Sequence, residues 1–222
     1  TSDTEWKDRV GAALRRAVDR RMIADVPVGV LLSGGVDSSL IVGLLAEAGQ
    51  QHLKTFSIGF EAAHGEAGDG FKDSDIIAKY FGTNHTKIMI PTEHMLESLP
   101  DTIGSMSEPM VSYDNVGFYL LSREVAKHVM VVQSGQGAVE VFAGYHCYPK
   151  LASSNDVLSD YMALFFDRDR EKLASHLNED WMAEEDDPAR MVEAHLMKDG
   201  AERPLDRVLR IDTTVMLVDD PV

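Results

Sequence analysis

Cysteine and basic residues are scarce in this chain of 222 residues. The single cysteine, Cys147, has no second cysteine for an internal disulfide, so a reducing compartment such as the cytoplasm is expected. Lys and Arg together number 21 against 37 Asp and Glu, which gives a formal net charge of -16. Because a phosphate backbone is bound by clustered Lys and Arg, this charge balance argues against a nucleic-acid partner.

Long apolar runs are also missing from the sequence. None approaches the roughly 20 consecutive apolar residues that a membrane-spanning helix needs, and the polar start TSDTEWKDRVG lacks an apolar signal core. Neither a membrane partner nor secretion is therefore expected. Hydrophobic residues make up 44% and charged residues 26%, which is ordinary for a globular protein with one large domain or one and a half.

Apolar residues recur with strand and helix spacing in alternation over the first part of the chain. The expected strands cover residues 28–32, 53–60, 85–90 and 129–133, and the expected helices cover residues 4–22, 38–48, 73–81, 92–103 and 116–127. This alternation predicts an α/β fold, a doubly wound parallel sheet, over residues 1–150. Strand patterns then stop, and helical spacing over residues 159–166, 171–177, 182–198 and 205–217 predicts a helical extension over residues 151–222.

Two features of the helical extension carry expectations of their own. The run NEDWMAEEDDPAR, residues 178–190, is dense in carboxylates. It is either a solvated loop and helix start or a docking surface for a basic partner. Apolar helical character continues to Pro221 and Val222, so we expect a chain truncated at its C-terminus.

The stretch SGGVDSS, residues 33–39, separates the first expected strand from the first helix after it. Ligands of open parallel sheets bind at such strand ends, and unpaired N–H groups at a helix start suit a phosphate. Gly34 and Gly35 allow close approach of the backbone, and the serines add hydroxyl donors. Asp37 would repel phosphates unless it holds a divalent cation. The alternative is an ordinary N-cap at Asp37 after a plain glycine turn.

The loop matches neither common nucleotide-binding pattern. No lysine follows the glycines as in G-x-x-x-x-G-K-[ST], and no G-x-G-x-x-G occurs there. SGGVDSS after a hydrophobic strand instead resembles the pyrophosphate-binding loop, or PP-loop, of the ATP pyrophosphatases. That resemblance implies an adenine nucleotide alpha hydrolase-like fold with bound ATP.

Further segments resemble the asparagine synthetase family in particular. TFSIGF and DSDIIAKYFGTNH are similar to that family's second strand and to the helix and strand after it. A third segment is similar to the family's fourth strand and to the loop usually written S-G-E-G-A-D-E-x-F-G-G-Y. Its sequence is SEPMVSYDNVGFYLLSREVAKHVMVVQSGQGAVEVFAGY. The similarity covers most of residues 5 to 150. The sequence of residues 108–119, together with Gln136, resembles the N-acetylglutaminylglutamine amidotransferase branch of the family.

The resemblance implies a reaction and its partners. Family members activate the carboxylate of a small amino acid or peptide with ATP, release pyrophosphate and form an acyl-adenylate. Ammonia or an amine then attacks the acyl carbon. The resemblance also implies Mg²⁺ and a glutaminase domain upstream in the full-length protein, and it allows a homodimer.

The resemblance assigns site residues by position in these motifs. The expected ATP-binding residues are Leu32, Ser33, Gly34, Gly35, Asp37, Ser38, Ser39, Ser57, Ile58, Ser134 and Gly135. Asp37 is also the expected magnesium ligand. Ser57 and Ile58 are equally well explained as a strand end in the core. Gln136 and Glu108 are the expected catalytic residues, although Glu108 also fits a solvated loop carboxylate before Pro109.

Two substitutions and one missing segment bear on activity. Gln136 replaces the first acid of the family loop, and Val139 replaces the Asp expected as the second magnesium ligand. An isopropyl group offers no lone pair. Glu140 is adjacent to Val139, but on a helix its side chain points about 100° away. The family's lysine in a K-V-D-R-like stretch, which would stabilise the adenylation transition state, follows a segment like DTTVMLVDDPV and is not reached.

Three functions therefore remain open. The first is the amide-forming domain of an asparagine synthetase-like enzyme. The second is a catalytically silent nucleotide-binding module, impaired by Val139 and Gln136. The third is another pyrophosphatase-type enzyme acting on a tRNA base or a purine nucleotide. The acidic charge argues against the tRNA base, and the resemblance of SGQGAVEVFAGY argues against the purine nucleotide. Cys147, His85 and His128 are expected to be structural or solvated, since no zinc-site spacing occurs.

Overall fold

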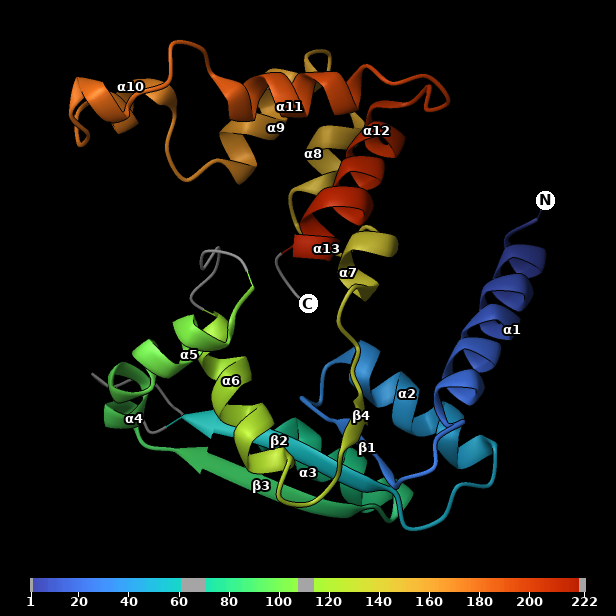
Figure 1. Cartoon of the computed structure of the whole chain (residues 1–222). Helices are drawn as coiled ribbons and strands as arrows, with labels where there is room; N and C mark the ends of the chain where they lie inside the picture. Colours follow the sequence, from blue (N-terminus) through green and yellow to red (C-terminus); the bar gives the residue numbers. More distant parts are fainter. Residues whose placement is uncertain (1, 61–70, 108–113, 220–222) are drawn as a thin grey trace. The chain divides into compact units, whose positions relative to one another are not determined.

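The computed structural model describes residues 2–60, 71–107 and 114–219. These residues form two compact units, Thr1–Gln136 and Gly137–Val222 (Figure 1). Each unit has its own hydrophobic core. Residues 137–150, which the sequence groups with the sheet, therefore belong to the second, helical unit.

The first unit is built on a parallel four-stranded sheet. Its strands are β1 (Val28–Leu31), β2 (Lys54–Phe60), β3 (Asn84–Ile90) and β4 (Val131–Gln133), in the order β3-β2-β1-β4. The register aligns Val30 with Thr55 on one side and with Gln133 on the other. The carboxyl ends of β1 and β4, neighbours in the sheet, lead directly into the two glycine-containing loops that the sequence marks for nucleotide binding.

Six helices accompany the strands of this unit in the described ranges. They are α1 (Asp3–Arg21), α2 (Val36–Glu47), α3 (Phe71–Phe81), α4 (Thr92–Glu97), α5 (Leu99–Ser105) and α6 (Asp114–Val125). Val30 packs with Val42 and Ala78, from α2 and α3, on one face of the sheet. Phe56 packs with Leu121, from α6, on the other. Both faces are thus covered, which confirms the predicted doubly wound α/β sheet.

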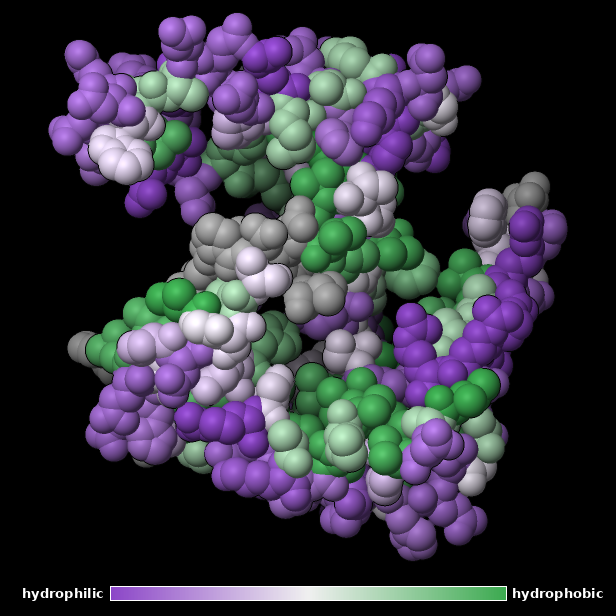
Figure 2. All heavy atoms as spheres, in the orientation of Figure 1, coloured by the Kyte–Doolittle hydropathy of each residue, from purple (hydrophilic) through white to green (hydrophobic). Residues whose placement is uncertain are grey.

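Helix α1 contributes little to the core. Val18 is its one buried residue among those described, and Leu14 packs partly against the same cluster. Trp6 is 54% exposed, with the Arg9 guanidinium over its ring. Figure 2 shows the hydrophilic surface along this helix. The apolar residues that predict this helix are therefore covered only in its C-terminal half.

All regular secondary structure in the described residues of the second unit is helical. Its helices are α7 (Ala138–Val141), α8 (Tyr148–Ala152), α9 (Val157–Phe165), α10 (Arg170–Ala174), the 3₁₀ helix η1 (Glu179–Trp181), α11 (Asp187–Leu196), α12 (Pro204–Ile211), the π-helix η2 (Asp212–Met216) and α13 (Leu217–Asp219). Tyr148, Leu151, Leu196 and Val208 form the centre of its core. Cys147 is buried in the same cluster, as expected for a structural cysteine.

Three helix predictions differ most from the structure. The helix expected over 92–103 is broken at Ser98, because Pro100 favours a new helix start. The helix expected over 182–198 begins only at Asp187, where Asp186 accepts from the Ala189 N–H and caps α11. The helix expected over 205–217 changes from α to π geometry at Asp212.

Candidate functional site

The loop after β1 presents a helix start without a side-chain cap. Gly35 is the N-cap of α2, and no side-chain hydrogen bond caps this end. Asp37 lies in the first turn rather than at the cap, so the plain N-cap reading of Asp37 is wrong. The first N–H groups of a helix have no intrahelical acceptors. They therefore remain available for an anion beside the positive end of the helix dipole.

Serine hydroxyls hold this loop in shape. Ser33 Oγ and Ser38 Oγ lie 3.0 Å apart, and Ser38 Oγ donates to the Gly35 carbonyl at 3.2 Å. The Gly35 N–H donates to Ser33 Oγ at 3.2 Å. Ser38 is buried and Ser33 is exposed, so the first serves the loop itself while the second can also reach a ligand. The Ser39 hydroxyl is buried without a protein partner in the described residues.

Gly34 brings the loop against the start of α3. Its φ is +87°, and a Cβ built on it would lie 2.5 Å from the Ser74 backbone nitrogen and 2.6 Å from Asp73 Cβ. Only glycine combines this conformation with this close approach. The two helix starts, of α2 and α3, are thereby fixed next to the same loop.

Gly135 brings the loop after β4 against the start of α2. A Cβ on Gly135 would lie 2.9 Å from both Asp37 Cβ and the Ser38 nitrogen. The Gln136 N–H donates to Ser134 Oγ at 3.3 Å, which turns the chain at this point. The structure therefore brings Gly135 and the predicted loop after β1 together.

The three remaining ATP-binding predictions occupy different surroundings. The Leu32 side chain is 1% exposed and packs in the core, so only its backbone borders the loop. Ser57 is buried, and its hydroxyl donates to the Leu32 carbonyl. Ile58 faces the opposite side of the sheet, toward α6. Leu32 and Ser57 thus support the loop from beneath, whereas the Ile58 side chain does not join them.

Ile58 lines a cavity at the carboxyl end of β2. The cavity holds about 280 Å³, and its wall consists of Ile58, Phe60, Met95, Asp114, Gly117, Phe118 and Leu121. Among the described residues of this wall, Asp114 is the one charged residue, and the others are apolar or glycine. Size and lining suit part of a small organic ligand.

A partly buried histidine joins the strands under the loop. His85 Nε2 lies 3.3 Å from Ser57 Oγ, and its Nδ1 lies 2.9 Å from Thr55 Oγ1. Burial lowers the pKa of His85, an effect that Asp75 opposes and Lys87 reinforces. The sequence prediction treats His85 as structural or solvated. A missed signal is the alternation of Thr55 and Ser57 along β2, which puts two hydroxyls on one face.

Two buried carboxylates lie among the described residues of the second unit. Glu140 Oε1 accepts from the Tyr145 hydroxyl at 2.6 Å, so Glu140 is engaged within the helical core. Asp212 is fully buried and accepts from Tyr148 and Tyr161, each at 2.7 Å. Burial raises the pKa of Asp212, and the two tyrosine hydrogen bonds oppose that rise. Val139, where the family loop has Asp, is partly exposed.

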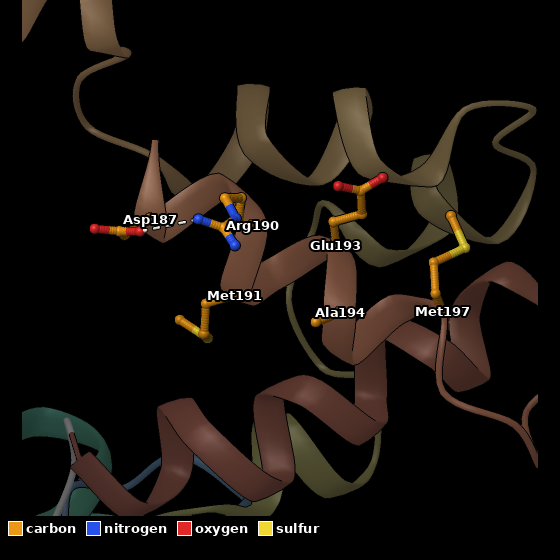
Figure 3. Close-up of a pocket in the computed structure, with 6 residues that line it drawn as sticks. All are labelled: Asp187, Arg190, Met191, Glu193, Ala194 and Met197. Carbon is orange, nitrogen blue, oxygen red and sulfur yellow. Dashed lines mark ion pairs between the residues drawn. The ribbon is translucent and has the colours of Figure 1, made fainter. Parts of the chain in front are cut away.

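A larger hollow lies along α11, in the second unit (Figure 3). It measures about 560 Å³, and its lining is Asp187, Arg190, Met191, Glu193, Ala194 and Met197. Figure 3 shows that these side chains come from α11 and from Met197, its C-cap residue. Asp187 and Arg190 pair with each other at 3.6 Å. A binding site needs polar groups that converge from several elements, so we regard this hollow as an exposed helix face.

The acidic run in the same unit is solvated. Glu184, Glu185 and Asp187 are exposed, and Arg170 donates to the carbonyls of Glu184 and Glu185. Arg190 pairs with Glu185. The exposure of these carboxylates, two of which pair with Arg190, agrees with the first of the two readings.

Metal ligands do not cluster in the part of the chain that the structure describes. No group of three His, Cys, Asp or Glu side chains there could hold an ion. Asp37 alone still fits Mg²⁺, because that ion takes one or two protein carboxylates and fills its other positions with water and substrate phosphates. Glu108 lies outside the described residues.

Comparison with known proteins identifies the family. The family model for asparagine synthase matches residues 9–222. The chain belongs to the asparagine synthase family. It is 36% identical over 152 residues to a glutamine-hydrolysing asparagine synthetase of Bacillus subtilis, a match covering 67% of this chain and 23% of that protein. A putative asparagine synthetase of Methanocaldococcus jannaschii is 39% identical over 130 residues, covering 58% and 24%.

Among solved structures, an NH3-dependent NAD synthetase from Campylobacter jejuni matches with a TM-score of 0.42 and 17% identity, covering 62% of this chain and 60% of that one. The chain spans about a quarter of the length of the asparagine synthetases it matches. None of its described helices is long and apolar enough to cross a membrane.

Proposed function

We propose that this chain is the ATP-dependent, amide-forming part of an asparagine synthetase-like enzyme. It activates a carboxylate as an acyl-adenylate, releases pyrophosphate and passes the acyl group to ammonia or an amine. Family membership supports this proposal. The observation that carries it is the close packing around the uncapped start of α2. A Cβ on Gly135, after β4, would lie 2.9 Å from the Ser38 nitrogen, and a Cβ on Gly34, after β1, would lie 2.5 Å from the Ser74 nitrogen.

The loop residues have separable roles in holding ATP. The N–H groups at the start of α2 bind the phosphates, and the exposed Ser33 hydroxyl adds a donor. Gly135 keeps a side chain away from the start of α2, and Gly34 lets the loop approach the start of α3. Asp37 would hold Mg²⁺, which neutralises phosphate charge when bound. Ser38, Leu32 and Ser57 keep the loop in shape rather than contact the nucleotide through their side chains.

The reaction depends mainly on how the enzyme positions the substrate carboxylate and the ATP phosphates. The substrate carboxylate must lie in line with the α-phosphorus and the departing pyrophosphate, which a preorganised set of N–H donors favours. Gln136, in the loop after β4, can donate or accept hydrogen bonds but cannot act as a carboxylate base. Glu108 remains our candidate for contact with the substrate or metal. The glutaminase domain of the full-length protein would supply ammonia.

The substrate is a small amino acid or peptide carboxylate. Aspartate fits an asparagine-forming enzyme, and N-acetylglutaminylglutamine fits the branch that residues 108–119 and Gln136 resemble. A reducing, cytoplasmic setting and a homodimeric assembly complete the proposal. No comparison favours the silent module, so Val139 and Gln136 are treated as modulators of rate.

ATP–pyrophosphate exchange in the full-length protein tests the proposal. Exchange should require Mg²⁺ and one of the two carboxylates, and Asp37→Asn should abolish it. The natural rate is expected to be weak because Val139 offers no metal ligand. If neither the natural protein nor its Val139→Asp variant exchanges pyrophosphate with any carboxylate tried, the amide-forming assignment is wrong.

A further inference from the structure

The contacts of His85 lead to Leu32, where the loop between β1 and α2 begins. We call this loop, residues 33–35, the nucleotide loop. His85 Nε2 lies 3.3 Å from the Ser57 hydroxyl, which in turn donates to the Leu32 carbonyl. Leu32 is the residue between β1 and the loop, and its N–H donates to the Phe56 carbonyl at 2.8 Å. The chain direction on entering the loop is therefore set by a β-ladder bond on one side of Leu32 and by Ser57 on the other.

The donors along this path can be assigned from their chemistry. A serine hydroxyl has one proton, and Ser57 uses it on the Leu32 carbonyl. Ser57 must then accept from His85, so His85 Nε2 carries a hydrogen. In the neutral ring Nδ1 is an acceptor, and it takes the hydrogen bond of Thr55 Oγ1 at 2.9 Å. Thr55 Oγ1 is in turn 2.8 Å from Thr83 Oγ1, which completes a one-directional chain of donors.

The same histidine also faces the helix that supports Gly34. His85 Nε2 is 4.0 Å from Asp75 Oδ1, in α3, and the other oxygen of Asp75 accepts from Lys87 at 3.0 Å. Ser74, the residue before Asp75, lies where a Cβ on Gly34 would point. The His85 ring thus touches both supports of the loop, β2 through Ser57 and α3 through Asp75.

We propose that His85, as its neutral Nε2–H tautomer, is a positioning residue for the nucleotide loop. It acts through Ser57 on the carbonyl of Leu32 and does not touch the nucleotide. This inference rests on the proposed function, since it assumes that the loop binds ATP. Asp75 and Lys87 are the charged groups that face the ring, from α3 and from β3 itself. Protonating His85 would force the Thr55 hydroxyl to turn around, so acid should weaken nucleotide binding.

Nitrogen NMR of the histidine ring tests the tautomer without any nucleotide. Long-range proton–nitrogen correlation on the full-length protein, with His85→Gln to assign the signals, should show a neutral Nε2–H ring at neutral pH. Ser57→Ala should shift the Nε2 signal. An Nδ1–H ring, or a ring already doubly protonated at neutral pH, would overturn the assignment of donors.

Calorimetric titration with a non-hydrolysable ATP analogue and Mg²⁺ tests the consequence. His85→Leu and Ser57→Ala should each weaken binding about five- to tenfold, the loss expected for one hydrogen bond. The double variant should bind no more weakly than Ser57→Ala, because both changes break one path. His85→Gln, whose amide can still donate to Ser57, should bind within about twofold of the natural protein. Thr102→Val, which removes a buried hydroxyl that donates to the Ser98 carbonyl, is the matched control and should change nothing.

The outcomes separate the two proposals. If the natural protein takes up no nucleotide, the proposed function fails and this inference fails with it, even where the tautomer is as assigned. If the natural protein binds and His85→Leu binds equally well, the positioning role fails and the proposed function stands. Additive losses in the double variant also exclude the path through Ser57. If His85→Leu does not fold by circular dichroism, His85→Gln and Ser57→Ala still decide the question.

Discussion

Gly135, after the last strand of the sheet, approaches Asp37 so closely that a Cβ on Gly135 would lie 2.9 Å from Asp37 Cβ. The two residues are nearly a hundred positions apart, and they meet because β1 and β4 are neighbours in the sheet. Since parallel strands end on one edge, the loops that follow them share that edge. The approach fixes the first turn of α2, where Asp37 and the free N–H groups lie.

Gly135→Ala should therefore damage nucleotide binding more than it damages the fold. The added methyl must displace either the β4 loop or the first turn of α2. We expect the affinity for an ATP analogue, measured by calorimetry, to fall at least about tenfold. Gly104→Ala is the control, because a Cβ there meets nothing within 4 Å and lies in α5. It should stabilise the protein slightly and leave binding alone. Equal binding by both variants would contradict this packing.

Gly34→Ala separates backbone strain from close approach. Gly34 has φ +87° and Gly49 has φ +80°, but only Gly34 faces another element, at the Ser74 nitrogen. An alanine at Gly49 should cost about 1 kcal/mol of unfolding free energy from its conformation alone. At Gly34 the collision should add about 1–3 kcal/mol. Urea denaturation of the two variants measures the difference. Equal losses would mean that α3 does not press against the loop.

The junction of β1, its glycine loop and α2, to which we assign the nucleotide, could be predicted from sequence because its requirements are local. Glycines that permit tight approach, hydroxyls and a strand–helix junction all occur within seven residues, 33–39. The strands were likewise readable, since buried parallel strands give continuous apolar runs such as residues 28–32. The doubly wound sheet follows from their alternation with helices.

The supports of the loop could not be predicted, because they depend on which strands are neighbours. His85 lies 28 positions from Ser57, and only the parallel register of β2 and β3 brings the two together. The structure likewise turns Ile58 away from Ser57, since successive side chains of a strand alternate between faces. The break at Ser98 and the π-helix at Asp212 are local, but helical periodicity alone does not distinguish them from continuous helix.

Val139→Asp tests whether the missing acid limits the rate. A carboxylate supplies the oxygen ligand that Mg²⁺ prefers, whereas the isopropyl group supplies none. We expect ATP–pyrophosphate exchange by the full-length protein to rise at least about tenfold and to saturate at lower Mg²⁺. Val139→Asn is the control for size and polarity, and it should gain much less. A gain shared equally by both variants, or by neither, would rule out a metal-ligand role at this position.

The carboxylate of Asp212 is fully buried and accepts hydrogen bonds from two tyrosines, Tyr148 and Tyr161. Burial raises the pKa of Asp212 above 3.8, and it also raises the pKa of Tyr148 and of Tyr161, so both hydroxyls remain donors. Because the folded state holds this proton more tightly than the unfolded state, stability is greatest below the ordinary pKa. It falls as pH rises toward the raised one.

Tyr148→Phe should therefore both lower stability and extend its pH dependence. Removing one donor to a buried carboxylate costs about 1.5–3 kcal/mol where Asp212 is charged. Because the Tyr148 hydrogen bond also opposes the rise in pKa, its loss moves the end of the pH-dependent window upward. Urea unfolding of the full-length protein from pH 4 to 8 measures both effects. Asp212→Asn should flatten the profile, and Tyr80→Phe, at an 80% exposed residue, should leave it unchanged. A Tyr148→Phe loss that is the same at every pH would show that Asp212 does not titrate in the folded protein.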